Sequence, residues 1–324
     1  MNENLTVLVG DVGGTHARFA IADVSAEPIR MSHRIDFGAD RFASFEAVLR
    51  TYLDQIGLTQ QPEAAAIAVA GPVTKGRVDF TNRGWHASEG QLRALGFRRA
   101  LLINDFAALA FSIAALKTTT FRAIGPELPG LEGEPITILG AGTGFGVSCL
   151  ARFRGRSVPV ATEGGHIGFA PRGEQQVAVL QILSRRFGHV SVERVLSGPG
   201  LENTYQALEE MDGRKPQALS APDIVAQSEA GDRSCRAAVD MFCSVYGAVA
   251  GDFALAHGAR GGVFIAGGIA EKIELYLKQG QFRAAFEDKG RLSYFVQPIP
   301  TSLMLDPDAT FLGAARASLE FSDT

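Results

Sequence analysis

The chain has 324 residues, of which 46% are hydrophobic and 20% are charged, and its formal net charge at pH 7 is −4. This length and composition fit a globular protein of two domains with an ample core. Because the charge balance is slightly acidic, no basic surface for nucleic acid is indicated, and we expect no nucleic-acid partner.

Cysteine usage and the N-terminus indicate the compartment. Cys149, Cys235 and Cys243 form no CxxC pair and have no His partner at zinc spacing, which is typical of buried thiols in a reducing environment. The first residues lack the basic and apolar regions of a signal peptide. No continuous apolar run approaches the roughly eighteen residues of a membrane helix. We expect a cytoplasmic protein with no membrane partner.

The first third of the chain alternates strand-like and helical patterns. Its predicted elements are, in order, strands at 5–10, 17–22 and 31–37, a helix at 44–57, a strand at 64–73, a helix at 88–95, a strand at 99–106 and a helix directly after that strand. The first three strands read as a β-meander, and the continuous apolar runs of the later strands indicate burial on both faces. This alternation predicts an α/β layer with a mixed sheet.

The pattern changes near residue 118, where a segment rich in Thr, Gly, Pro and Glu begins. The elements predicted beyond it are a second strand–turn–strand unit, "PITILGAGTGFGVSCLARF", helical segments over 174–257, a strand at 261–269, a helix at 270–280 and a terminal helix at 309–321. We expect a small α/β domain over 1–117, joined by a C-terminal helix within 307–324, and a large α+β domain over 118–306.

Two glycine-rich bends occupy corresponding positions in these halves. Aligned on Gly10 and Gly140, "LVGDVGGTHARFAIAD" and the later unit each read as strand, glycine turn, strand, with a threonine hydroxyl at Thr15 or Thr143. Glycine permits positive φ and lets backbone N–H groups approach an anion. Either bend alone could be an ordinary hairpin. Their repetition predicts a duplicated unit whose bends hold phosphates.

Two common phosphate-binding motifs are missing from the sequence. No G-x-x-x-x-G-K-[ST] occurs. The dinucleotide pattern G-x-G-x-x-G fails after Gly142, because Phe145 stands at the last glycine position. P-loop chemistry and hydride transfer are therefore both disfavoured.

Several segments together carry a resemblance to a known family. They are "GDVGGTHARFAIAD", "INDFAA", "GAGTGFGV", "EGGHIGFAP", "GHVSVERVLSGPGL", "GGVFIAGGI" and "FRAAFEDKGR". The set resembles the bacterial glucokinases of the actin–hexokinase–Hsp70 superfamily and covers nearly the whole chain. The first motif marks only the superfamily, whereas "INDF", "EGGH" and "GHVSVERVLSGPG" together are far more specific. The resemblance implies a two-domain α/β fold of the actin-like ATPase (ribonuclease H-like) class, with a duplicated glycine-turn hairpin.

The resemblance also implies a kinase that transfers the γ-phosphate of ATP to the 6-hydroxyl of D-glucose. Asp105 would be the general base that accepts the proton of this hydroxyl. From its position after a buried strand alone, Asp105 could equally be a helix N-cap. The sugar hydroxyls would bind Asn104, Asp105, Glu163, His166 and Glu193. These residue types suit the role because hydroxyls both donate and accept hydrogen bonds.

Two glycines and two histidines near these residues have other expected roles. Gly164 and Gly165 are expected to let the backbone approach the sugar ring, and His189 is expected to be structural. His16 departs from the family, which usually has Asn at this point of the first bend. If His16 touches the nucleotide or the sugar, the affinity for that ligand would differ from that of other family members. Because Gly13 and Gly14 would bind through backbone N–H groups, we expect His in place of Asn to be tolerated.

The nucleotide contacts implied by the resemblance lie in three glycine-bearing segments. They are Gly10, Asp11, Val12, Gly13, Gly14 and Thr15 in the first bend, Thr143 and Gly144 in the second, and Gly267 and Gly268 at a strand-to-helix turn. Asp11 would hold Mg²⁺ through water, because a compact divalent ion needs hard oxygen partners. The cysteine-rich zinc motif of a related kinase group does not occur, so we expect no zinc. A homodimer is implied by the resemblance alone.

Three other functions are possible on the sequence alone. A kinase of another hexose or of an amino sugar would share these patterns and differ in its substrate. A sugar-responsive transcription repressor would need an N-terminal helix-turn-helix, and the first bend already begins at residue 8. An actin-like filament or chaperone ATPase would not require Asn104 and Asp105 together with Glu163 and His166.

Overall fold

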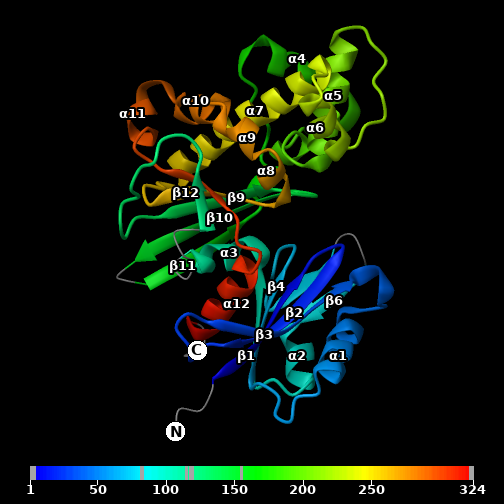
Figure 1. The fold of residues 1–324 in the computed structure, drawn as a ribbon, viewed down its shortest axis with the longest axis vertical. Helices are drawn as coiled ribbons and strands as arrows, with labels where there is room; N and C mark the ends of the chain where they lie inside the picture. The colour runs from blue at the N-terminus through cyan, green and yellow to red at the C-terminus, as the bar shows by residue number, and fades with distance from the viewer. Residues whose placement is uncertain (1–4, 81–83, 114–115, 117–119, 154–155, 321–324) are drawn as a thin grey trace. The chain divides into compact units, whose positions relative to one another are not determined.

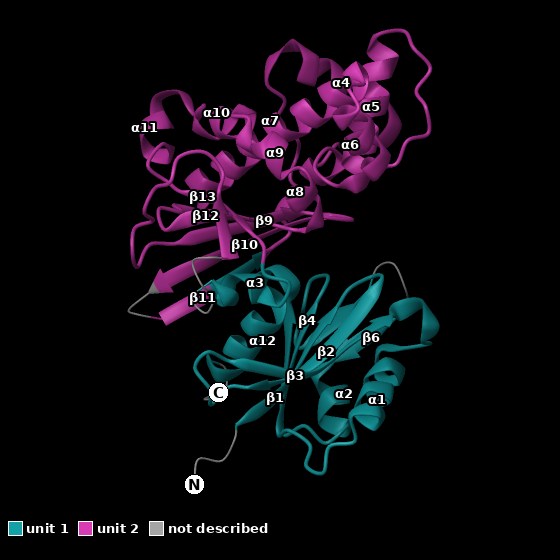
Figure 2. Ribbon diagram, viewed as in Figure 1, with its two compact units in different colours: residues 1–117, 159–161, 306–324 teal, residues 118–158, 162–305 magenta. Residues whose placement is uncertain are grey.

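The chain folds into two compact units, each with its own sheet (Figures 1 and 2). The computed structural model describes residues 5–80, 84–113, 116, 120–153 and 156–320. Unit 1 comprises residues 1–117, 159–161 and 306–324, and unit 2 comprises residues 118–158 and 162–305.

Unit 1 is built on a five-stranded sheet of order β3-β2-β1-β4-β7. Its strands are β1 (Thr6–Val12), β2 (His16–Asp23), β3 (Arg30–Gly38), β4 (Ala64–Val69) and β7 (Arg99–Asn104), with a small separate pair of β5 (Arg77–Asp79) and β6 (His86–Ser88). Its helices are α1 (Phe45–Ile56), α2 (Glu89–Ala94), α3 (Asp105–Ser112) and α12 (Ala309–Glu320). The first three strands pair antiparallel, whereas β1, β4 and β7 run parallel. The predicted meander and mixed sheet are confirmed.

Alternate side chains of the central strands supply a core on each face of this sheet, because successive residues of a strand point to opposite sides. Leu8 and Ile67 pack with Phe45 on the face that α1 and α2 cover. Val9 packs with Phe311 of α12 on the other face. Burial on both faces explains the continuous apolar runs. The contact of Phe311 shows that the terminal helix packs on the sheet formed by the first third of the chain.

Helix α1 begins and ends where its sequence signals predict. The Ser44 hydroxyl caps the helix by accepting the N–H of Ala47 at 3.1 Å. The helix ends at Gly57, which adopts a left-handed conformation with φ 52°. These two signals explain why the prediction at 44–57 is confirmed.

Unit 2 has a six-stranded sheet of order β11-β10-β9-β12-β13-β8, with its helices gathered on one face (Figure 1). The strands are β8 (Phe121–Ala123), β9 (Ile136–Ala141), β10 (Phe145–Phe153), β11 (Arg156–Thr162), β12 (Gly262–Ala266) and β13 (Thr301–Met304). The helices are α4 (Gly173–Phe187), α5 (Gly198–Met211), α6 (Ala221–Glu229), α7 (Arg233–His257), α8 (Gly268–Lys272), α9 (Glu274–Lys278), α10 (Gln281–Glu287) and α11 (Ser293–Val296). Two 3₁₀ turns, η3 (Gly164–His166) and η4 (Val192–Arg194), carry predicted site residues. β9 pairs antiparallel with β10 and parallel with β12.

Helix α7 is the central helix of unit 2. An 18-residue window of this helix has a mean hydropathy of 1.3, which by length and composition would let it cross a membrane. Asp240, Ser244 and Asp252 interrupt the apolar residues of α7, so the sequence showed no continuous apolar run here. In the structure 78% of it is buried, as in the core helix of a globular domain. Cys235 and Cys243 of this helix and Cys149 of β10 are buried and unpaired with one another, as predicted.

The structure differs from the expected elements at several places. β4 is shorter than the predicted strand at 64–73, because the chain turns at Gly71, whose φ is 130°. The helix predicted at 270–280 is divided into α8 and α9 at Ile273, whose ψ of 19° leaves the helical region. The strands β5, β6, β8 and β13 were not predicted, because three or four residues show too little periodicity. The seven-residue β11 was not predicted either, because Pro159 stands in the middle of its pattern.

The "FRAAFEDKGR" segment has a structural role. The guanidinium of Arg283 is buried and donates to the carbonyls of Ile299 at 2.8 Å and Gln297 at 2.6 Å. The Nζ of Lys289 donates to Asp252 of α7 at 2.6 Å. Burial lowers the pKa of Lys289, although the Asp252 carboxylate opposes this shift. These bonds tie α10 and the chain after it to α7, so this motif stabilises unit 2.

Candidate active site

The predicted site residues of unit 1 lie at the carboxyl edge of its sheet. β1, β4 and β7 are parallel neighbours, with Val12 opposite Val69 and Val69 opposite Asn104. The first glycine bend follows β1 and Asp105 follows β7, so both lie at the same edge, about 10 Å apart across two strand spacings. Ligands of open α/β sheets bind at this edge.

Asn104 and Asp105 join β7 to α3. The N-cap of α3 is Asn104, whose Oδ1 accepts the N–H groups of Phe106 at 3.0 Å and Ala107 at 3.1 Å. Its Nδ2 donates to Oδ1 of Asp105 at 3.0 Å and to the carbonyl of Gly71 at 3.3 Å. The alternative that Asp105 is the N-cap is therefore wrong. Asp105 is the first residue of the helix, and Asn104 orients its carboxylate.

The first bend exposes backbone at its tip. The N–H of Gly13 donates to the carbonyl of His16 at 2.9 Å and closes the turn around the exposed residues Gly14 and Thr15. Gly10, by contrast, is buried in β1, and a Cβ there would lie 2.8 Å from a side-chain carbon of β4. Packing therefore explains the glycine at position 10, whereas the residues of the tip remain accessible to a ligand.

Side chains around the first bend have partners within unit 1. The Asp11 carboxylate accepts a hydrogen bond from the guanidinium of Arg18, directly across the β1–β2 pair. The Val12 side chain is fully buried, so only its backbone could face a nucleotide. Nδ1 of His16 lies 3.0 Å from Oδ1 of Asp36, and both side chains are more than half exposed. The imidazole that departs from the family pattern thus contacts the neighbouring strand.

In unit 2 the second glycine bend contacts the turn after β12 and the N-terminus of α5. The N–H of Gly142 donates to the carbonyl of Gly144 at 2.8 Å, and the carbonyl of Gly142 accepts the N–H of Gly198, the first residue of α5, at 2.9 Å. Gly267 has φ 92°, and a Cβ there would lie 2.5 Å from the carbonyl oxygen of Ala141. The exposed residues of this group are Thr143, Gly267 and Gly268. The end of β9, the turn after β12 and the N-terminus of α5 therefore form one cluster.

Glu163 directly precedes the turn η3, and His166 is the last residue of this turn. Oε2 of Glu163 lies 3.9 Å from Nε2 of His166, and both side chains are mostly exposed, so both are accessible to a ligand. A Cβ on Gly165 would overlap the carbonyl oxygen of Phe145, and one on Gly164 would lie 2.7 Å from a ring carbon of α7. The space beside these two glycines is filled by β10 and α7. Packing, rather than the approach of a sugar ring, requires glycine at both positions.

Glu193 lies on η4, beside the second bend. Its Oε2 accepts the N–H of Phe145 at 2.8 Å. An N–H of η4 donates to the carbonyl that follows η3 at 2.9 Å, so the two turns are adjacent. Nε2 of His189 lies 3.3 Å from the carbonyl oxygen of His166, a contact that suits a structural role. Unit 2 thus brings the three predicted sugar ligands of its own chain segment to one place.

Tyr246 of α7 supports the second bend from within the core. Its fully buried hydroxyl accepts the N–H of Ala141 at 3.2 Å. We expect Tyr246→Phe to lower the free energy of unfolding by about 1–3 kcal/mol, because a buried donor loses this acceptor. Urea denaturation measures the change, with Tyr294→Phe, at a 70% exposed ring, as control. Equal midpoints for the two variants would contradict this role of the hydroxyl.

Comparisons with known proteins identify the family. The family model described as Glucokinase matches residues 8–320. The chain belongs to the glucokinase family. A glucokinase from Caulobacter sp. (strain K31) is 46% identical over 311 residues, which cover 96% of this chain and 94% of that protein. The expected family membership is confirmed.

Solved structures agree with this glucokinase assignment. A glucokinase from an Antarctic psychrotroph has a TM-score of 0.88 and 34% identity, and the match covers 98% of this chain and all of that one (100%). A ROK family glucokinase from Streptomyces griseus, in complex with glucose and AMPPNP, has a TM-score of 0.63 at 17% identity, with 97% and 99% covered. The second likeness shows the fold alone. Both neighbours are consistent with the α/β architecture described above.

The candidate site contains contacts that the sequence did not predict. Arg18 pairs with Asp11, Gly198 binds the second bend, and the backbone N–H of Phe145 binds Glu193. Arg18 and Gly198 both stand inside motifs of the family resemblance, so the signal for them was present. The bond to Phe145 joins residues 48 positions apart and involves only backbone on one side, which no sequence motif indicates.

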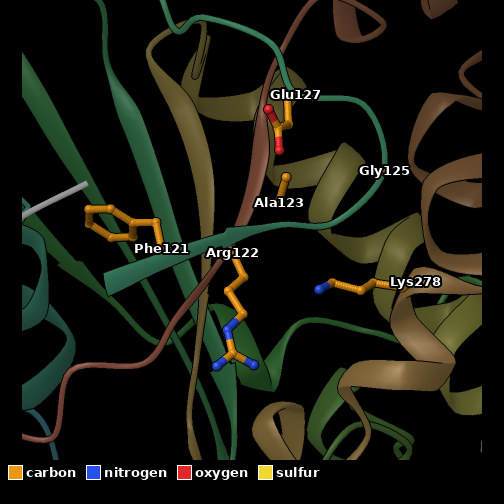
Figure 3. A pocket seen from close by; sticks show the side chains of 6 residues that line it. All are labelled: Phe121, Arg122, Ala123, Gly125, Glu127 and Lys278. Atoms are coloured by element: carbon orange, nitrogen blue, oxygen red, sulfur yellow. The ribbon is translucent and has the colours of Figure 1, made fainter. Parts of the chain in front are cut away.

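A separate cavity of about 480 Å³ lies in unit 2 (Figure 3). It is lined by Phe121, Arg122, Ala123, Gly125, Glu127 and Lys278. Arg122 and Lys278 both form ion pairs with the carboxylate of Glu274, at 2.7 Å and 2.6 Å. Because Glu274 pairs with both cations and none of the predicted ligands lines the cavity, we assign the cavity no role in the candidate site.

Proposed function

We propose that this enzyme transfers the γ-phosphate of ATP to the 6-hydroxyl of D-glucose, giving glucose 6-phosphate and ADP. The observation that carries the proposal is the position of Asp105, oriented by Asn104 at the same sheet edge as the first glycine bend. A helix N-terminus favours negative charge, which is the form of a carboxylate that accepts a proton. Asp105 would act as general base toward the 6-hydroxyl.

The sugar would be recognised through its hydroxyl groups. Glu163, His166 and Glu193 would bind them from unit 2. Asn104 would hold Asp105 in place, and its Nδ2 would bind a sugar hydroxyl by giving up its 3.3 Å bond to the carbonyl of Gly71. Carboxylates form stronger, charge-assisted hydrogen bonds with hydroxyls than neutral acceptors do. The 46% identical Caulobacter protein, which is named a glucokinase, supports glucose as the sugar.

The nucleotide would bind the two glycine bends of an actin-like ATPase fold. The exposed backbone at Gly14 and Thr15 and at Thr143 would face phosphates, and the turn at Gly267 and Gly268 would lie against the adenosine. Backbone N–H groups at such turns form anion-binding concavities. The Streptomyces griseus protein, which shares this fold, is in complex with AMPPNP, so ATP as the phosphate donor is compatible with the fold.

Asp11 fits a water-mediated contact to Mg²⁺. An ionised carboxylate offers about four lone-pair positions, so the bond from Arg18 leaves acceptors for the water shell that Mg²⁺ usually keeps. Mg²⁺ would neutralise charge on the β- and γ-phosphates. In the described part of the chain, no group of three or more His, Cys, Asp or Glu side chains could hold a metal directly.

A coupled assay of ADP release tests the proposed reaction. We expect ADP release to depend on glucose and to be fastest with glucose among a panel that includes mannose, fructose and N-acetylglucosamine. A faster rate with another sugar would replace glucose as the substrate. ADP release that does not depend on any sugar would point to a filament or chaperone ATPase.

A further inference from the structure

The carboxylate of Glu193 occupies the space beside Gly144 that a side chain would fill. An ideal Cβ on Gly144 would lie 2.5 Å from Oε2 of Glu193 and 3.3 Å from its Cδ. The backbone of Gly144 is not in the left-handed region, so a residue with a side chain could adopt its conformation. The position therefore requires glycine because of the carboxylate and not because of backbone strain.

Hydrogen bonds hold both the side chain and the main chain of Glu193. Its Oε2 accepts the N–H of Phe145, the residue after Gly144, at 2.8 Å. Its carbonyl oxygen accepts the hydroxyl of Ser197, the N-cap of α5, at 2.8 Å. A Cβ added at Gly200 would lie 3.0 Å from the same carbonyl oxygen. The main chain of η4 therefore has little room to move back, and a side chain at position 144 would displace the carboxylate.

We propose that Gly144 is a positioning residue for sugar binding, because it leaves the space that keeps Glu193 on the second phosphate bend. This inference rests on the proposed function and deepens it, since it assigns to the sugar site a glycine that the resemblance places with the nucleotide. One carboxylate oxygen fixes the bend through Phe145. The sugar-binding carboxylate and the phosphate-binding bend therefore form one structural piece of unit 2.

The substitution Gly144→Ala tests this assignment with glucose alone. We expect the Kd for glucose, measured by titration calorimetry without nucleotide, to rise about 10- to 100-fold, because hydrogen bonds to a displaced charged group are lost. The collision is with the end of a flexible side chain, so the protein should keep its fold, which circular dichroism and thermal melting would check.

Gly142→Ala is the matched contrast in the same bend. A Cβ on Gly142 meets no atom within 4 Å, so this variant should leave Glu193 in place and the Kd for glucose within about twofold of wild type. If Gly144→Ala and Gly142→Ala bind glucose equally well, Gly144 does not position the sugar site. If the unsubstituted enzyme binds no glucose, the proposed function fails instead, and the two failures are distinguishable.

A double-mutant cycle with Glu193→Ala separates an effect through Glu193 from a direct one. Once the carboxylate is removed, Gly144→Ala has no partner to displace, so adding it should change the Kd for glucose by less than about twofold. Coupled residues give such non-additive effects, whereas independent sites add. An additive loss in the double variant would overturn the proposal, because Gly144 would then act without Glu193.

Discussion

Asp105→Asn should lower kcat by about 10²- to 10⁴-fold, the usual contribution of a general base. Asparagine keeps the shape of the side chain, and its Oδ1 can still accept the bonds that Asn104 and Phe106 now donate at 3.0 Å and 2.9 Å. The N-terminus of α3 should therefore stay folded. What the amide cannot do is accept the proton of the attacking hydroxyl. Steady-state kinetics of glucose phosphorylation would measure the loss.

The same variant should bind glucose nearly as well as the unsubstituted enzyme. Calorimetry would show whether the loss lies in kcat or in binding. Asp54→Asn, at an exposed position of α1, removes the same charge from unit 1 and should leave kcat within about twofold. A variant at position 105 that keeps more than half of the original kcat would rule out Asp105 as the base.

The fold was predictable where capping residues mark the ends of an element or a long apolar run marks a buried strand. Ser44 and Gly57 mark the ends of α1, and the fully buried β4 appears in the sequence as an uninterrupted apolar run. Short edge strands such as β8 could not be predicted, because their place depends on pairing with β13. The division of the helix at Ile273 was also hidden, since both halves continue the same apolar spacing.

The candidate site was predictable residue by residue but not in its contacts. The family resemblance of their motifs predicted Asn104 and Glu193 as sugar ligands. The sequence did not show that Asn104 is the cap of α3, or that the glycines of "EGGH" pack against β10 and α7. These facts depend on segments that are distant in the chain, and only the folded backbone brings them together.

Gly313 of α12 lies directly against the backbone of α3, the helix that begins with Asp105. A Cβ on Gly313 would lie 2.5 Å from the carbonyl carbon of Ala108 and closer still to its oxygen. Both groups are backbone, so no side chain can turn aside to relieve the overlap. The two helices could only separate, and they share the buried core of Phe111 and Ala317.

Gly313→Ala should therefore lower the free energy of unfolding by at least about 3 kcal/mol, the upper end of the cost of overpacking. Alanine gains about 1 kcal/mol over glycine in helix propensity, which is too little to offset the overlap. Gly90→Ala is the matched control, because this helical glycine of unit 1 would place its Cβ 3.7 Å from the nearest atom, the Ser88 hydroxyl oxygen. The control should gain about 0.4–1 kcal/mol, so urea denaturation of the two variants should shift in opposite directions. Because a displaced α3 would carry Asp105 away from its position, kcat of the Gly313→Ala protein should fall as well. If Gly313→Ala were as stable as Gly90→Ala, α12 would not be packed on α3 at this contact, and the terminal helix would have no part in positioning the base.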